Sequence, residues 1–119
     1  MSYVWIFIGG GLGSMARFCI SDLLSKYNYN FPLATLIANF LASLILGFFL
    51  AQALAGNGSD IKKALIMTGF CGGFSTFSTF SAESFQLLQQ GHYGYVLLNI
   101  FGSIVVCLIG VGIGYKLGA

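Results

Sequence analysis

Hydrophobic residues dominate four long stretches of the chain, and short runs of polar and turn-forming residues separate them. The stretches cover about residues 3–24, 33–54, 61–90 and 93–117. A helix needs about 20 apolar residues to cross a bilayer, and each stretch reaches that length. The pattern therefore predicts an all-α integral membrane protein with four transmembrane helices in a single domain, residues 1–119.

The third stretch departs from a plain helix at two neighbouring glycines, Gly72 and Gly73. Glycine pairs are common sites of helix breaks, and broken membrane helices can use the freed carbonyls to bind ions such as Na⁺. We therefore expect the third helix to be broken near residues 72–75. A kink that neighbouring side chains fill is the alternative at this point.

After the glycine pair, aromatic and hydroxyl residues recur at every third position. They form three sets: Phe74, Phe77 and Phe80; Ser75, Ser78 and Ser81; and Thr76 and Thr79. Residues three apart lie on nearly the same face of a helix, so a stripe of rings runs beside a stripe of hydroxyls. Polar side chains are costly in hydrocarbon and usually have a function there.

Uncharged polar residues also interrupt the second and fourth stretches. Asn39 lies within the second, while Asn99 and Ser103 are four residues apart in the fourth and Cys107 continues their line. Hydrogen bonding between helices is one interpretation of these residues. Amide and hydroxyl groups also donate hydrogen bonds, and ring edges carry positive partial charge. Because no acidic residue lies near a span centre, the set favours a small anion over a cation.

Composition narrows the class of protein further. Hydrophobic residues make up 57% of the 119 positions and charged residues 7%, and the mean hydropathy is +0.89. Soluble domains carry about 25% charged residues, so a soluble fold is excluded. Four spans leave no room for a catalytic domain, which argues against an enzyme. The net charge of +2 is too small to indicate nucleic-acid binding.

The few basic residues barely specify an orientation in the membrane. With four spans, Lys62, Lys63 and Lys116 lie on one side, and Lys26 and Arg17 belong to the other. The positive-inside rule needs a clear excess of Lys and Arg on one side. We therefore expect copies to insert in both orientations, which permits an antiparallel dimer.

Arg17 is the basic residue that lies furthest from the end of a predicted span. Its side chain can reach the membrane interface, pair with Asp22 or Glu83, or help to draw anions into a vestibule. We favour anchoring at the interface with a modest electrostatic contribution. For Glu83, a structural pairing is favoured over proton chemistry.

Glycines are concentrated in the first and fourth stretches, at positions 9, 10, 11 and 13 and at positions 102, 110, 112 and 114. Membrane helices associate through small residues that let their backbones approach closely. We therefore expect these glycines to mark tight helix packing.

The residues now assembled resemble the Fluc (CrcB) family of fluoride channels. The similarity rests on residues 69–81 together with Glu83, and residues 10–13 and 34–39 support it. It covers essentially the whole chain. Ala34 and Ala42 stand where the family usually has glycine, and Ser14 and Phe18 where it often has alanine and tyrosine; these are conservative changes at packing positions.

The resemblance implies an antiparallel, dual-topology homodimer with two pores in a plasma membrane. Such a channel passes F⁻ passively out of the cytoplasm, rejects Cl⁻ and protects against fluoride toxicity. The implied pore residues are Phe77 and Phe80, whose ring edges face fluoride, and Asn39, Ser78, Thr79, Ser81, Asn99 and Ser103. Asn99 and Cys107 differ from the residues often found at their positions.

The resemblance also implies a cofactor. The broken helix would hold a structural Na⁺ at the dimer interface through the backbone carbonyls of Gly72 and Ser75 of both subunits.

Two other classes of protein share this size and weak charge bias. A small four-helix multidrug/proton antiporter needs a carboxylate in the middle of its first span, where this chain has Arg17 and, at the end, Asp22. A purely structural membrane subunit would use the hydroxyls and Asn39 only to join helices.

Overall fold

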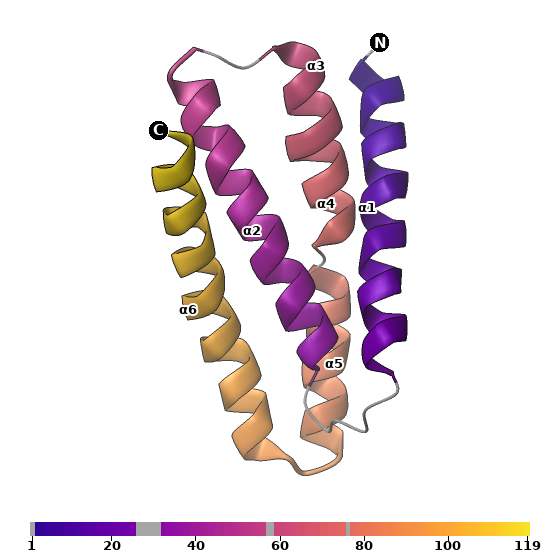
Figure 1. Ribbon diagram of the computed structural model, residues 1–119. Coiled ribbons are helices and arrows are strands. Elements are labelled where there is room, and N and C mark those ends of the chain that lie inside the picture. Colours follow the sequence, from indigo (N-terminus) through magenta and orange to yellow (C-terminus); the bar gives the residue numbers. More distant parts are fainter. Residues whose placement is uncertain (1, 26–31, 57–58, 76) are drawn as a thin grey trace.

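The computed structural model describes residues 2–25, 32–56, 59–75 and 77–119. Within these ranges the regular elements are all helices (Figure 1). Lys26, which enters the charge comparison, and Thr76, from the hydroxyl stripe, lie outside the described residues. The prediction of an all-α chain is confirmed for the part that the structure describes.

Three long helices match three of the predicted spans closely. They are α1 (Ser2–Leu24), α2 (Leu33–Leu54) and α6 (Tyr93–Gly118), with 23, 22 and 26 residues. At 1.5 Å per residue, each is more than about 30 Å long, the thickness of a bilayer core. Among the described helices, these three are long and apolar enough to cross a membrane.

The third predicted span is divided into shorter pieces, so an unbroken helix over residues 61–90 is absent. A short helix, α3 (Asp60–Lys62), leads into a π-helix, η1 (Lys63–Phe70), and then into α4 (Cys71–Phe74). Ser75 is extended, with φ −94° and ψ 150°, and α5 (Phe77–Gln89) follows. The expected break near residues 72–75 is confirmed, but Gly72 and Gly73 stay helical and the chain opens at Ser75.

The π-helix was not predicted from the sequence. In it, the N–H of residue i bonds a carbonyl five residues earlier, as the N–H of Cys71 does with Ile66. π-helices are rare and usually last a single turn. Here η1 extends over eight residues and lies directly against α1.

The helices pair in two groups. The segment from α3 to α4 packs beside α1, and α6 packs along α2 (Figure 1). The N- and C-termini lie at the same end of the bundle, near α3 and the end of α2 (Figure 1). This arrangement agrees with an even number of passes through the membrane.

Glycines allow α1 to approach the broken segment closely. A Cβ atom added at Gly9 would lie 2.0 Å from the Leu65 carbonyl oxygen, and one at Gly13 would lie 2.2 Å from the Phe70 carbonyl oxygen. On the other side, a Cβ at Gly73 would lie 2.3 Å from the Gly10 carbonyl oxygen. Side chains at these positions would push the two backbones apart.

Close approach of two backbones at glycines also joins α2 to α6. Added Cβ atoms at Gly47 and Gly114 would lie 2.2 and 2.1 Å from the carbonyl oxygens of Val111 and Leu44. The predicted packing role is thus confirmed for Gly9, Gly13, Gly110 and Gly114. It is wrong within this chain for Gly11 and Gly112, whose added Cβ atoms would meet nothing within 4 Å among the described residues.

The buried core is small and lies where these helices converge. Ala38 and Ala42 of α2 pack with Phe74 at the end of α4, and all three are at most 4% exposed. Many larger apolar side chains remain exposed, for example Phe7, Leu108 and Leu117 at 82, 67 and 71%. In water such a surface would aggregate, whereas in lipid it is the expected exterior.

Candidate functional site

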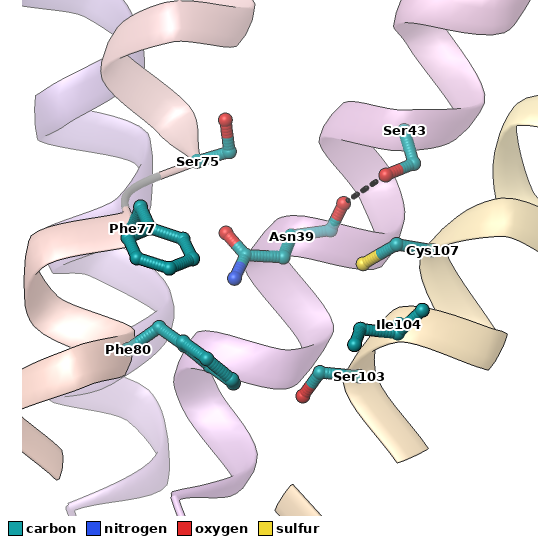
Figure 2. Close-up of a pocket in the computed structure, with 8 residues that line it drawn as sticks. All are labelled: Asn39, Ser43, Ser75, Phe77, Phe80, Ser103, Ile104 and Cys107. Carbon is teal, nitrogen blue, oxygen red and sulfur yellow. Dashed lines mark hydrogen bonds between the residues drawn. The ribbon is translucent and has the colours of Figure 1, made fainter. Parts of the chain in front are cut away.

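A groove with a volume of about 280 Å³ lies between α2, the start of α5 and α6 (Figure 2). It forms where the chain opens at Ser75, because the break separates α4 from α5 at this depth. Among the described residues its lining is uncharged and consists of Asn39, Ser43, Ser75, Phe77, Phe80, Ser103, Ile104 and Cys107.

Asn39 provides the amide of the groove. It lies near the middle of α2 and is half-buried, and its side chain points toward Phe77 and Phe80 (Figure 2). Ser43, one turn later, donates its hydroxyl to the Asn39 backbone carbonyl at 2.8 Å. An amide NH₂ can donate to an anion as well as to a neighbouring helix.

Phe77 and Phe80 form the aromatic wall at the start of α5. Their ring centroids are 5.6 Å apart and the rings are tilted by 42°. Phe80 is half-buried, while Phe77 is 79% exposed. A large aromatic ring this exposed beside the break is available for contact with another protein surface.

The opposite wall comes from α6. Ser103 and Cys107 line the groove, as the four-residue spacing predicts, together with Ile104 (Figure 2). Asn99 is one turn earlier but is only 2% exposed and lies outside the lining. Its Nδ2 donates to Ser84 Oγ of α5 at 2.8 Å, and its Oδ1 accepts from Ser103 Oγ at 3.3 Å.

The other predicted hydroxyls of α5 are not in the groove lining. Ser78 and Ser81 are exposed and Thr79 is half-buried. The structure therefore brings Asn39, Phe77, Phe80 and Ser103 together and leaves Ser78, Thr79, Ser81 and Asn99 outside this lining. Their part in ion passage stays a prediction.

Arg17 lies at the break rather than on an exposed surface. It is half-buried, and its Nε donates to the Gly73 backbone carbonyl at 3.3 Å. The backbone N–H and hydroxyl of Ser75 both donate to the Cys71 carbonyl, at 3.0 and 2.7 Å. A positive charge at a helix C-terminus is favourable, so Arg17 stabilises the end of α4. A contribution to an anion vestibule stays a prediction.

Glu83 is paired, as expected, and its partner comes from α2. The hydroxyl of Thr35 donates to the Glu83 carboxylate, and Thr35 is buried. Arg17 also attracts this carboxylate electrostatically. The broken segment is therefore tied to α1 through Gly73 and to α2 through Glu83, on the two sides of the break.

Comparison with known proteins places the chain in a family. Residues 4–115 match the model of the family described as CrcB-like protein, Camphor Resistance (CrcB). The chain belongs to the CrcB-like family.

Curated relatives of this CrcB-like chain extend over most of its length. It is 43% identical over 113 residues to a protein of Pyrococcus abyssi, which covers 94% of this chain and 91% of the relative. It is 38% identical to one from Coxiella burnetii, over 99 and 98% of the two chains. It is 46% identical to one from Escherichia coli, over 84 and 80%. Each is named "Fluoride-specific ion channel FluC".

Side chains provide no conventional metal site in the described part of this CrcB-like chain, where no three His, Cys, Asp or Glu residues gather. A cation would therefore need backbone oxygens. The carbonyls at the end of a helix have no partner within that helix, and Gly72 and Ser75 lie in this position around the end of α4. Gly72 is exposed, and a Cβ added to it would meet none of the described residues within 4 Å. The residues thus fit a Na⁺ that is approached from outside the chain.

Sequence reasoning missed three residues around the groove. Ser43 is one turn from Asn39, so a search for polar residues four apart would have found it. Ser84 had no such signal, because its partner Asn99 lies on another helix. Ile104 is an ordinary apolar residue in the sequence, and only the packing of α6 directs it into the groove.

Proposed function

We propose that this protein is a fluoride-selective passive anion channel in the plasma membrane, which lets F⁻ leave the cytoplasm and so protects against fluoride toxicity. The observation that carries the proposal is the groove itself, in which the Asn39 amide faces two phenylalanine rings and none of the described lining residues is charged. The chain belongs to a family whose curated relatives are named fluoride-specific ion channels, and this supports fluoride as the ion that passes.

The chemistry of the groove suits a small, strongly hydrated anion. Such an ion gives up water only if close hydrogen-bond donors replace it, and the amide and hydroxyl groups supply these donors. Ring edges of Phe77 and Phe80 add positive partial charge. Conduction also requires that binding be weak enough for the ion to leave, and a lining whose described residues include no Lys or Arg meets that requirement.

The channel is proposed to be an antiparallel homodimer of copies inserted in both orientations, each with the broken third segment also crossing the membrane. The groove is open on one side of the chain, and Phe77 at its rim is 79% exposed. A second copy would close the groove and complete the pathway. The near-balance of basic residues between the two ends of the bundle supports insertion both ways.

A structural Na⁺ at the dimer interface is part of the same proposal. The carbonyls of Gly72 and Ser75 from both copies would hold it, and the ion would supply the positive charge that lets two helix C-termini approach each other. We expect dimers in detergent to dissociate more readily when N-methylglucamine replaces Na⁺. Equal dimer stability in both cations would contradict the Na⁺ site.

Ion release from liposomes tests the function. Purified protein is reconstituted with internal KF or KCl, and efflux is started with a potassium ionophore. We expect rapid fluoride release while chloride is retained. Release of neither ion would leave a structural subunit, and proton-coupled uptake of cationic drugs would indicate an antiporter.

A further inference from the structure

A chain of hydrogen-bonded side chains, buried at Asn99 and Ser103 and half-buried at Ser84, joins the α6 wall of the groove to α5. It consists of Ser84, Asn99 and Ser103, linked by bonds of 2.8 Å between Ser84 Oγ and Asn99 Nδ2 and 3.3 Å between Asn99 Oδ1 and Ser103 Oγ. Ser103 lines the groove and Asn99 does not. Asn99 is 2% exposed, so an ion in the groove would meet Ser103 and not the amide.

The direction of these bonds decides what Ser103 presents to the groove. A serine hydroxyl has one proton and two lone pairs. In the structure that proton goes to Asn99 Oδ1, so the lone pairs of Ser103 are left for the groove. A fluoride ion only accepts hydrogen bonds and would be repelled by them.

Rotation of the Asn99 amide by half a turn reverses the direction of both of its hydrogen bonds. Nδ2 then donates to Ser103 Oγ, Oδ1 accepts from the Ser84 hydroxyl, and the Ser103 proton becomes available to an ion. The amide keeps both neighbours, because its oxygen and nitrogen exchange places. Both hydrogen bonds of the amide break and re-form in this rotation. The Ser103 bond, at 3.3 Å, is longer than the usual 2.5–3.0 Å of an O–H···O bond.

We propose that Asn99 is a positioning residue whose amide reversal turns Ser103 into a hydrogen-bond donor when an anion enters the groove. The inference rests on the proposed function, since it requires an anion there. It also explains why an amide suits this buried position: of the groups that could join Ser84 to Ser103, the amide combines a donor end with an acceptor end.

The chain also connects the two walls of the groove. Ser84 is one helical turn after Phe80 on α5, and Ser103 faces Phe80 from α6 (Figure 2). Rotation of the Asn99 amide therefore changes whether Ser103 donates a hydrogen bond opposite the Phe80 ring, without moving a helix.

A double-mutant cycle on fluoride efflux tests the proposal. Asn99→Leu keeps the size of the side chain and removes its hydrogen bonds. We expect it to lower fluoride efflux per reconstituted channel about tenfold, the effect of one hydrogen bond. The loss should persist in a Ser103→Thr background, which keeps the hydroxyl, and fall below about twofold in Ser103→Ala, which has none.

Ser43→Ala is the matched control background. Ser43 lines the same groove, but its proton goes to the Asn39 carbonyl within α2. Asn99→Leu should therefore still cost about tenfold there. If Asn99→Leu yields no folded protein, Asn99→Ala is used with the same expectations.

The outcomes separate the inference from the function on which it rests. Equal losses in the Ser103→Ala and Ser103→Thr backgrounds would overturn the proposed amide reversal while leaving the channel function intact. Unchanged efflux for Asn99→Leu would do the same. A wild-type protein that releases no fluoride would overturn both. A loss of fluoride efflux confined to backgrounds that retain the Ser103 hydroxyl supports the proposed amide reversal, because a purely structural role of Asn99 does not depend on that hydroxyl.

Discussion

Phe77 and Phe80 are one turn apart on α5 but have different surroundings. Phe80 is half-buried and lies with Asn39 and Ser103 in the groove, whereas Phe77 is 79% exposed at its rim. The position of Phe80 is therefore fixed by its own chain. Phe77 needs a second copy to define its surroundings, in agreement with the proposed dimer.

Replacing Phe80 by isoleucine tests the aromatic wall. Isoleucine is apolar but has no ring edge to face an anion, so we expect Phe80→Ile to reduce fluoride efflux by about tenfold or more while the dimer stays intact on gel filtration. Phe85→Ile is the matched control, because Phe85 is 58% exposed on the same helix and outside the groove lining. Equal efflux for Phe80→Ile and wild type would remove the ring from the mechanism.

Of the predicted pore residues, Ser78, Thr79 and Ser81 of α5 and Asn99 of α6 lie outside the groove lining. Residues four apart, such as Ser103 and Cys107, stay close to one face of a helix. Phe77 and Phe80 occupy the face of α5 that lines the groove, and Ser78 and Ser81, each one residue later, lie about 100° further around the helix. The interruption at Ser75 adds a further change of direction. For these two reasons Ser78 and Ser81 leave the lining that Ser75 occupies, although all three belong to one periodic set.

At the scale of helices, hydropathy was sufficient to locate α1, α2 and α6 within a residue or so. It could not indicate η1, because the same residue types form α- and π-helices and the difference lies in which carbonyl each N–H reaches. The contact with α1 shows what η1 achieves. The Leu65 carbonyl oxygen and the Phe70 nitrogen, five residues apart, both lie against Gly9.

Alanine substitutions in α1 test this packing. We expect Gly13→Ala to lower the free energy of unfolding by about 1–3 kcal/mol through overpacking, because its Cβ would lie 2.2 Å from the Phe70 carbonyl oxygen. Gly11→Ala gains the same helix propensity without a neighbour within 4 Å in the described chain. Unfolding in detergent measures both variants, and a Gly13→Ala protein as stable as Gly11→Ala would contradict the packing.

The break in the third segment could be predicted, but its position within four residues could not. Gly72 and Gly73 have the sequence signature, yet Gly73 is held in α4 by its close approach to Gly10 and by the Arg17 bond to its carbonyl. These contacts come from another helix, so no local signal records them. Ser75, which bonds back to Cys71, becomes the residue where the helix ends.

At the scale of the whole molecule, the distribution of the few basic residues between the two ends of the bundle bears on its orientation in the membrane. The termini lie at one end of the bundle (Figure 1), and five basic residues in the whole chain give neither end a clear excess. Nothing in this distribution favours one orientation over the other.

A tag at the C-terminus tests insertion in both orientations. In intact cells we expect the tag to react with impermeant reagents from outside in about half of the copies, because the charge bias is nearly zero. Adding two lysines to one end of the bundle should shift the population toward one orientation. A tag found on a single side in the unaltered protein would contradict the antiparallel dimer.

The measurement that tests the central claim most directly is the reversal potential of the reconstituted channel between a fluoride solution and a chloride solution of equal concentration. We predict a large displacement from zero, of the sign that a membrane permeable to fluoride requires, together with a current that needs no proton gradient. A reversal potential at zero, or one displaced toward chloride, would contradict a fluoride-selective pathway through this groove.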